Sequence, residues 1–194
     1  MKFRYEVPSI SRKQDAIDFI NEFHKYNSSI HGTGGLERYL NNYEEWLLKL
    51  EQDYVREVTE DNVPKRTYFL IRTDDNKIIG ISNIRLKLNQ KYLYYGRNIG
   101  YSIRPTERGK GYNKINLYLA LKVCKKYEIK KALLDVDKAN MASWKTMGAL
   151  GANLDLEMKS EIEGCGFVRF YSIDVEKSLN TYKEQYEPLI EQFE

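Results

Sequence analysis

The chain contains 194 residues, 42% of them hydrophobic and 30% charged, which suits one packed domain and argues against extensive disorder. Its net charge of +3 is too small to indicate a nucleic-acid-binding protein, and its two cysteines cannot form a disulfide framework. No apolar run approaches the roughly 18 residues of a membrane span, and the first residues contain no signal-peptide core, so we expect a cytoplasmic protein with no membrane partner. The two histidines, His24 and His31, belong to no zinc motif, and we expect no metal site.

Two helices are expected in the N-terminal part. Residues 11–27 carry apolar side chains at helical spacing behind Ser11, a residue type that favours helix N-termini. Residues 36–57 form a longer apolar stripe with the same period, and their other face is acidic. The glycine-rich segment His31–Gly35 lies between the two and predicts a flexible loop.

The central part of the chain changes to the alternation that is typical of strands. Three β-rich runs are expected to form an antiparallel meander, namely residues 67–71, 77–88 and 92–103. An amphipathic helix to about Tyr127 follows them. The last expected elements are a strand, a helix and two final strands, over residues 132–136, 140–150, 153–158 and 166–175.

This order, α-α-β-β-β-α-β-α-β-β, predicts a mixed α/β (α+β) fold. No internal repeat or flexible linker interrupts the pattern, so we assign residues 1–175 to a single domain. Residues 176–194 are expected to form an acidic, helical C-terminal extension.

The clearest functional pattern lies where the third run meets the helix that follows it. The chain passes from Ile103 through Arg108-Gly109-Lys110-Gly111 and then directly into that helix. A helix N-terminus offers free N–H groups and the positive end of its dipole, and glycine lets the backbone approach a ligand closely. Residues 104–131 also hold nine basic and two acidic residues. The pattern predicts a pyrophosphate site, although a plain turn can carry the same glycines.

Two well-known nucleotide-binding loops do not match this segment. The dinucleotide fingerprint requires glycine where this chain has Lys114, and a P-loop requires Gly-Lys-Ser/Thr, which does not follow Gly111. The lysines over residues 122–131 are typical of a solvated helix face, and no stacking pattern of aromatic and basic residues accompanies them. We therefore expect no nucleic-acid partner.

A second segment lies downstream of this loop. Ile99–Tyr112 joins a strand to the glycine loop, and Asp137–Ser143 places Asn140 and Ser143 at the start of the next predicted helix. Together these segments resemble the GNAT superfamily of acetyl-CoA-dependent N-acetyltransferases. The first is similar to the family's fourth strand and pyrophosphate loop, with the consensus Arg/Gln-x-x-Gly-x-Gly/Ala, and the second to its Asn-x-x-Ala/Ser helix. The element order over residues 3–175 also agrees, and the leading helices resemble a bacterial subgroup of predicted acetyltransferases.

The resemblance implies a mostly antiparallel central sheet whose fourth and fifth strands splay apart, with acetyl-CoA bound in the gap as the acetyl donor. A primary amine on a small molecule or a peptide would attack the acetyl thioester directly. Relatives are often dimers, so a homodimer is a further expectation. The residues that the resemblance assigns to cofactor binding are Tyr101, Ser102, Ile103, Arg108, Gly109, Lys110, Gly111, Tyr112, Asn113, Asn140 and Ser143.

The chain departs from the family pattern at three positions. Asn98 stands where the fourth strand often carries a Glu or His base, and Met147 stands where the family's general-acid tyrosine is common. Asn113 replaces a small loop residue, and its side chain could crowd the phosphate or donate to it. A catalytically degenerate CoA-binding or protein-interaction module is therefore the alternative to an active N-acetyltransferase.

Other side chains are candidates for the missing roles. The proposed catalytic residues are Tyr171 and Asp137, with Tyr101, Tyr118 and Asp135 as alternatives. Each tyrosine has a core position as its competing explanation, and the aspartates have helix capping as theirs. The proposed acceptor-binding residues are Asn98 and His31, since a loop histidine can act as a base near neutral pH.

Overall fold

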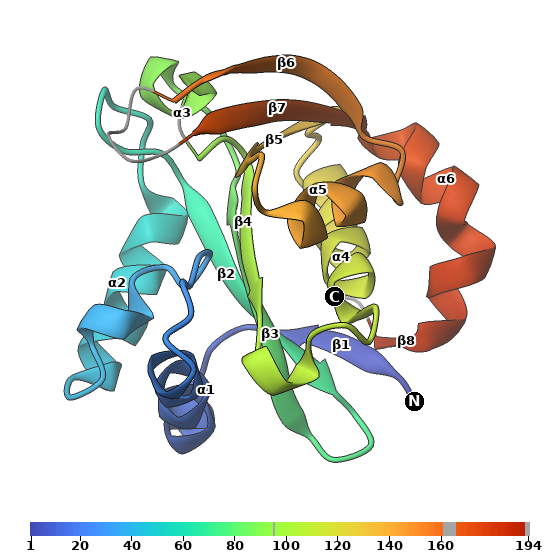
Figure 1. The fold of residues 1–194 in the computed structure, drawn as a ribbon. Helices are drawn as coiled ribbons and strands as arrows, with labels where there is room; N and C mark the ends of the chain where they lie inside the picture. Colours follow the sequence, from blue (N-terminus) through green and yellow to red (C-terminus); the bar gives the residue numbers. More distant parts are fainter. Residues whose placement is uncertain (95, 161–165, 193–194) are drawn as a thin grey trace.

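The computed structural model describes residues 1–94, 96–160 and 166–192, so Cys165 lies outside the described residues (Figure 1). Its strands form two sheets, with the orders β4-β3-β2-β1-β8 and β5-β7-β6. The larger sheet consists of β1 (Phe3–Glu6), β2 (Lys65–Arg72), β3 (Lys77–Arg85), β4 (Ile99–Ile103) and β8 (Ile190–Gln192). The smaller consists of β5 (Lys131–Asp137), β6 (Asn153–Lys159) and β7 (Phe167–Asp174). Among the described strands only β1 and β8 pair in parallel, so the predicted mixed and mostly antiparallel fold is confirmed.

Helices cover both sides of the larger sheet (Figure 1). On one side lie α1 (Lys13–Lys25) and α2 (Tyr43–Val55), and on the other lie α4 (Tyr112–Lys126), α5 (Met141–Gly148) and α6 (Val175–Tyr186). A short helix, α3 (Gln90–Tyr94), precedes β4. The described helices include none with the length and apolarity needed to cross a bilayer.

Each side of the sheet has its own apolar core. Phe19 of α1 and Trp46 of α2 are fully buried against β2 and β3, because the apolar stripes of both helices face the sheet. On the opposite side α4 buries residues from Ile115 to Cys124, since the sheet covers one of its flanks and α5 and α6 cover others. This sandwiching holds the start of α4 in a fixed position at the end of β4.

The structure adds elements that the sequence pattern did not predict. β1 and β8 were missed, and the run over residues 92–103 contains both α3 and β4. The tyrosines of this run suggested a strand, but Asn89 accepts the Tyr92 N–H through Oδ1 at 3.0 Å and caps a helical turn instead. The helix expected over residues 36–57 begins only at Tyr43, because Leu36–Arg38 forms a separate 3-10 turn.

The C-terminal segment is part of the folded body. It forms α6, which Asp174 caps by accepting the Lys177 N–H at 2.9 Å, and then the strand β8 beside β1. The predicted helix is therefore correct for the first part of the segment and wrong for Ile190–Gln192. Strand pairing of β8 with β1 attaches the segment to the larger sheet.

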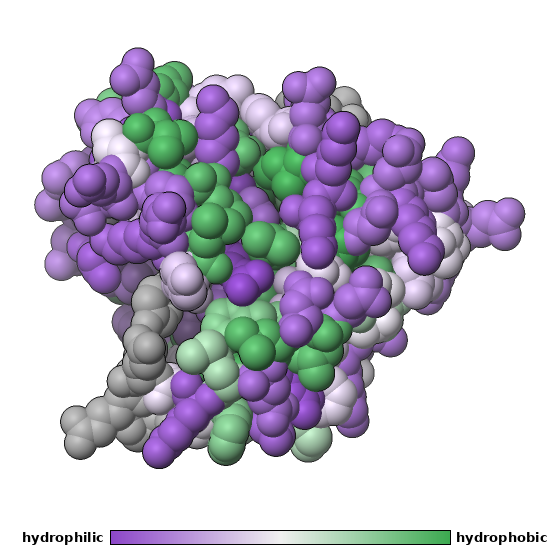
Figure 2. Space-filling view, turned by 90° about the horizontal axis from the view of Figure 1, so that it is seen from above, coloured by the Kyte–Doolittle hydropathy of each residue, from purple (hydrophilic) through white to green (hydrophobic). Residues whose placement is uncertain are grey.

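The strand β6 forms the free edge of the smaller sheet. Leu154, Leu156 and Met158 alternate along it and are exposed by 50%, 51% and 39%. Seen from the end of the molecule where β6 lies, apolar side chains gather between charged ones (Figure 2). An exposed apolar edge strand is a potential site for pairing with another chain.

Candidate active site

An opening between β4 and β5 is the centre of the candidate site. At its closed end, the Asn98 N–H donates to the Leu133 carbonyl and the Leu133 N–H donates to Asn98 Oδ1, both at 2.9 Å. The Asn98 amide also donates to the Arg85 carbonyl at 3.1 Å, so one buried side chain joins β3, β4 and β5. Beyond this junction β4 and β5 belong to different sheets, and the predicted splay between them is present.

The backbone of β4 presents an edge to this opening. The Arg85 N–H donates to the Asn98 carbonyl and the Arg104 N–H donates to the Ile79 carbonyl, so the even-numbered residues of β4 bond toward β3. The backbones of Tyr101 and Ile103 consequently face the opening, as predicted for pantetheine contacts. Ser102 differs, because its backbone faces β3 and its hydroxyl accepts the His31 N–H at 2.8 Å.

The loop between β4 and α4 has the conformation expected of an anion cradle. Gly109 and Gly111 have φ values of +77° and +81°, a region that glycine adopts without strain. A Cβ placed on either residue would meet no atom within 4 Å, so their outer surfaces are open to a ligand. The first turn of α4 contains no acidic residue, and its N–H groups point into the same space.

Two buried ion-pair clusters hold this loop in place. Glu107 accepts from Arg72 at 2.8 Å and from Lys110 at 2.9 Å. Burial opposes the Glu107 charge, but the hydrogen bonds from these two cations outweigh burial and lower its pKa to about 2. On the α1 side, Glu22 accepts from the backbone and hydroxyl of Thr106 at 2.9 and 2.7 Å. The Lys110 ammonium is thus partly neutralised before any phosphate arrives.

Arg108 is a cation of the loop that forms no ion pair with the described residues, although Glu22 acts on its charge from farther away. Its Nε donates to the Ile103 carbonyl at 3.1 Å, and its guanidinium lies 5.4 Å from the centre of the Phe23 ring. These contacts fix the side chain at the mouth of the opening and leave its charge available to a phosphate.

The far wall of the opening is the start of α5. Asn140 caps this helix, since its Oδ1 accepts the Ser143 N–H at 3.2 Å. The hydroxyls of Ser143 and Tyr101 lie 2.7 Å apart and bridge the opening on its α4–α5 side. Burial raises the pKa of Tyr101 to about 12, so this phenol stays protonated at neutral pH. The Asn113 amide turns toward Thr146 at 3.4 Å, away from the phosphate cradle.

The structure places the other predicted site residues outside this cluster. Tyr171 on β7, the strand between β5 and β6, is buried in the core, and Met147 on α5 is buried as well. The Asp137 carboxylate is exposed and accepts the Ala139 N–H at 2.8 Å in the turn before α5, whereas the cap of that helix is Asn140. His31 lies over β4 through its backbone, with its side chain exposed. Tyr118 is also unsuited, because its hydroxyl donates to Glu187 at 3.1 Å under α6.

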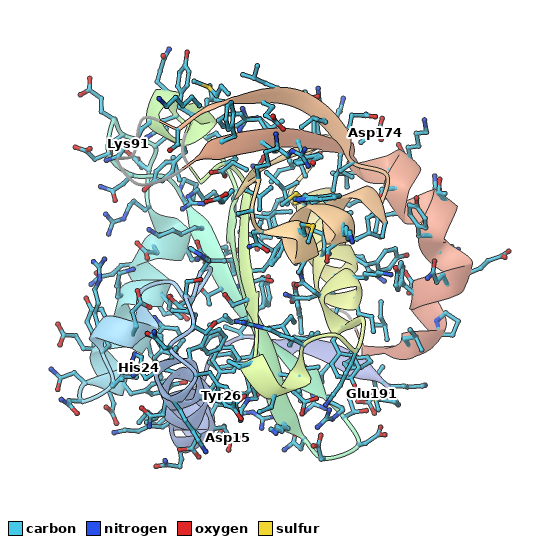
Figure 3. All side chains as sticks on the ribbon, in the orientation of Figure 1. Asp15, His24, Tyr26, Lys91, Asp174 and Glu191 are labelled. Carbon is cyan, nitrogen blue, oxygen red and sulfur yellow. The ribbon has the colours of Figure 1, made fainter. Side chains whose placement is uncertain are left out.

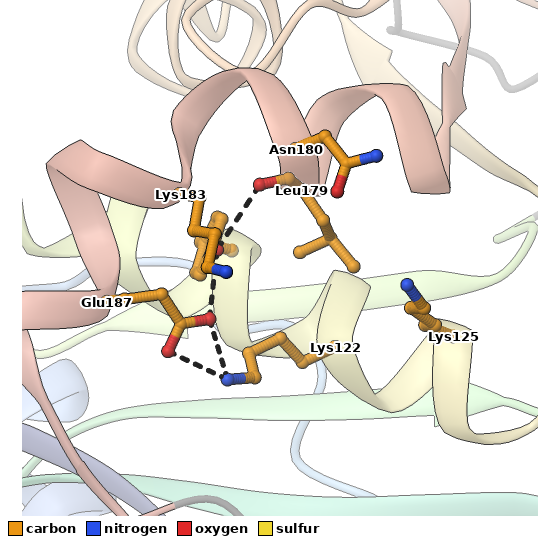
Figure 4. Close-up of a pocket in the computed structure, with 7 residues that line it drawn as sticks. Lys122, Lys125, Leu179, Asn180, Lys183 and Glu187 are labelled. Atoms are coloured by element: carbon orange, nitrogen blue, oxygen red, sulfur yellow. Dashed lines mark hydrogen bonds and ion pairs between the residues drawn. The ribbon is translucent and has the colours of Figure 1, made fainter.

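That last contact belongs to a separate cleft of about 340 Å³ between α4 and α6 (Figure 4). Lys122 donates to both carboxylate oxygens of Glu187 at 2.8 and 3.0 Å, which ties α6 to α4. No residue of the glycine loop lines this cleft. It serves the docking of the C-terminal segment.

Among the described residues, Cys124 and His24 take no part in the site. Cys124 is fully buried, and burial raises the pKa of its thiol to about 12, which makes it unreactive. His24 is exposed on the surface of α1 (Figure 3). Within the described ranges no group of three or more His, Cys, Asp or Glu side chains could hold a metal ion.

The sequence patterns did not indicate the roles of several residues that build the site. Glu22 of α1 and Arg72 of β2 anchor the loop from elements that are distant along the chain, and the bridging role of Asn98 depends on the position of β5. Asn98 was predicted to contact the acceptor, and in the described part of the chain its side chain bonds to the backbone of β3 and β5.

The residues present suit a CoA thioester. An exposed strand edge can pair with the amide-containing pantetheine arm, and the open glycines at the start of α4 can receive its pyrophosphate. This combination defines an acyltransferase that uses a CoA-bound acyl group.

Comparison with known sequences identifies the family. The family described as the acetyltransferase (GNAT) domain matches residues 11–153, so the chain belongs to the GNAT acetyltransferases, which take an acetyl group from acetyl-CoA. The resemblance found in the sequence is thereby confirmed, as is acetyl-CoA as the donor. No curated protein sequence gives a significant match.

Solved structures with the same fold cover nearly the whole chain. RimJ from Mycobacterium smegmatis, in complex with CoA-disulfide, has a TM-score of 0.66 and 13% identity, over 92% of this chain and 88% of its own. Mutant forms of the spermidine/spermine N-acetyltransferase SpeG from Vibrio cholerae give 0.64 and 15%, over 93% and 98%. The ribosomal-protein-S5-alanine acetyltransferase from Vibrio fischeri gives 0.63 and 14%, over 90% and 93%. At these identities the likeness shows the fold.

Proposed function

We propose that the protein is an active N-acetyltransferase whose acceptor is a primary amine on a small molecule or a peptide. The observation that carries this proposal is the β4–β5 opening with the open glycine loop at its mouth. The similar structures include enzymes named for a polyamine and for a protein alanine, which supports either size of acceptor. Because acetyl-CoA is an intracellular compound, the reaction also implies a cytoplasmic enzyme.

Acetyl-CoA, when bound, supplies the acetyl thioester. In our proposal the Tyr101 and Ile103 backbones align the pantetheine arm, and the amides of Arg108–Asn113 hold the pyrophosphate with the Arg108 charge beside them. We do not include Ser102 among the proposed cofactor-binding residues, because its backbone pairs with β3 and its hydroxyl accepts the His31 N–H. Asn140 acts by fixing the first turn of α5.

The leaving thiolate needs a proton donor, and Met147 cannot provide one. The Tyr101–Ser143 hydroxyl pair fits this role, because it lies inside the opening and remains protonated at neutral pH. It replaces Tyr171 in our proposal, since the latter is buried in the core. Ser143→Ala and Tyr101→Phe should each lower turnover with little change in acetyl-CoA affinity.

Calorimetry with acetyl-CoA tests the binding part of the proposal. We expect micromolar binding by the wild-type protein and at least tenfold weaker binding by Arg108→Glu. Lys126→Glu is the matched control, because Lys126 lies at the other end of α4. No binding at millimolar acetyl-CoA, or equal affinity of wild type and Arg108→Glu, would contradict the proposed cradle.

Thiol release with a panel of polyamines, amino acids and peptides tests turnover. A degenerate CoA-binding module is the second candidate, and the absence of a base at Asn98 and of an acid at Met147 favours it. Acetyl-CoA binding without turnover of any amine would select that candidate. Turnover of any amine would exclude it.

We also propose a homodimer formed through β6. Its exposed leucines and free edge support a partner strand from a second copy. Leu156→Lys should then convert a dimer into a monomer in light scattering, and a monomeric wild type would rule this contact out.

A further inference from the structure

One partly exposed carboxylate, Asp135, lies on β5 just beyond the junction that closes the opening. It is the second residue after Leu133, to which Asn98 is bonded. Leu134 and Val136 point into the core beneath α4, so Asp135 points to the opposite face. Its cross-strand partner on that face is Phe170, and the Arg97 guanidinium lies 4.5 Å from the centre of the Phe170 ring.

The corresponding face of the larger sheet, from which Arg85 acts on Asp135, is the one covered by the His31–Gly35 loop. Asn83 and Arg85 share a face of β3, and the Asn83 amide donates to Thr67 at 2.8 Å. A Cβ on Gly34 would lie 2.7 Å from the same Thr67 hydroxyl, so the loop rests on this face. Asp135 therefore faces the side of the opening opposite to the Tyr101–Ser143 pair.

The Asp135 carboxylate is only lightly engaged. Its Oδ2 accepts the Gly96 N–H at 3.3 Å, and among the described residues no cation lies within ion-pair distance of it. Arg85 on β3 and Arg97 before β4 act on it from farther away and stabilise its charge. Burial is the larger influence and leaves the Asp135 pKa above its usual value. A carboxylate with a raised pKa and few fixed partners is a better proton acceptor than one locked in an ion pair.

We propose that Asp135 is the proton acceptor for the attacking amine, in the role that Asn98 cannot fill. This inference rests on the proposed amine acetylation. The amine nitrogen forms a bond to the acetyl carbon, and the carbon–sulfur bond breaks. The proton lost by the nitrogen goes to the Asp135 carboxylate, and the sulfur receives a proton from the Tyr101–Ser143 pair.

The surroundings of Asp135 favour this step in two ways. The positive charges of Arg85 and Arg97 disfavour a further cation beside them, so an amine that enters here is held in its neutral, nucleophilic form. The acceptor and the donor of protons lie on opposite faces of the opening, so each keeps the protonation state that its task requires.

Asp135→Asn is the decisive variant, because asparagine keeps an oxygen that can accept the Gly96 N–H. We expect kcat/KM for a turned-over amine to fall by about 100-fold or more, with acetyl-CoA affinity and melting temperature unchanged. The acidic limb of the pH profile should disappear as well. The control is Asp174→Asn, an exposed aspartate at the other end of the smaller sheet where asparagine can still cap α6, and it should stay within twofold of wild type.

Carbon-13 NMR of the aspartate carboxyls in the ligand-free protein gives a readout independent of turnover. The signal missing from Asp135→Asn should titrate above the ordinary aspartate value of about 3.9. A midpoint at or below that value, or wild-type turnover in Asp135→Asn, would overturn the assignment. A wild-type protein with neither acetyl-CoA binding nor turnover would instead contradict the proposed function.

Discussion

Replacing Glu107 by glutamine removes the negative charge at the centre of the loop anchor while keeping the shape of the side chain. Glu107 is only 5% exposed and lies between Arg72, Lys77 and Lys110. Burial raises the pKa of Glu107, but the surrounding cations lower it by more, from the usual 4.5 to about 2. A difference of this size corresponds to about 3 kcal/mol of folding stability at neutral pH. Arg72 keeps a second partner in Asp75, so the variant leaves no isolated buried charge.

The pH dependence separates this electrostatic contribution from a packing defect. Because the folded-state pKa of Glu107 is the lower one, its contribution is complete above about pH 5 and is lost as the pH falls toward 2. Urea unfolding of wild type and Glu107→Gln should therefore differ by about 3 kcal/mol at pH 7 and by less than about 1 kcal/mol near pH 2.5.

The control is Asp75→Asn, which removes the more exposed carboxylate on the same Arg72. Its side chain is 45% exposed, so the variant should lose less than about 1 kcal/mol. A Glu107→Gln protein within 1 kcal/mol of wild type at pH 7 would refute the reasoning. A loss of stability in Glu107→Gln that is the same at every pH would also refute it.

Three further predictions concern the backbone of the site. Gly111→Ala, at φ +81°, should cost about 1 kcal/mol of stability and weaken acetyl-CoA binding in calorimetry. The control Gly148→Ala should do neither. Equal acetyl-CoA affinities of wild type and Gly111→Ala would contradict a close approach of phosphate to Gly111. Gly32→Ala should lower the melting temperature strongly, because its Cβ would lie 2.2 Å from the Gly100 carbonyl oxygen; an unchanged melting curve would show that the loop does not rest on β4. Asn140→Ala should lower the free energy of unfolding in urea by about 1 kcal/mol, because the cap of α5 is lost. Asn140→Ser or Asn140→Asp should keep most of this stability. If neither does, the capping role is contradicted.

The prediction of a cofactor side from the sequence depends on local patterns. The segment Ile99–Asn113 contains a strand end, two glycines and a helix start in direct succession, so the chain itself brings them together. The same holds for Asn140 and Ser143, which are three residues apart on one helical turn. Such patterns can be recognised without knowledge of the rest of the fold.

The proposed catalytic residues could not be predicted from local patterns of this kind. Tyr171 and Tyr101 are both tyrosines on strands, and only packing decides that the first is buried in the core while the second reaches Ser143. Asp135 and Asp137 are two residues apart on one face of β5. The segment before β4 contacts Asp135 through the Gly96 N–H and leaves that carboxylate partly exposed, whereas Asp137 lies in solvent.

The sequence by itself determined the family, the mixed fold, the acetyl donor and the glycine loop at the start of α4, because each depends on residues adjacent in the chain. Tertiary structure alone decided which side chains lie together at the opening. Asn98 bonds to Leu133 and Tyr101 to Ser143 across separations of 35 and 42 residues, and no local spacing encodes such contacts. The opening between β4 and β5 exists because two sheets meet at one end and diverge at the other, and that geometry requires the folded chain.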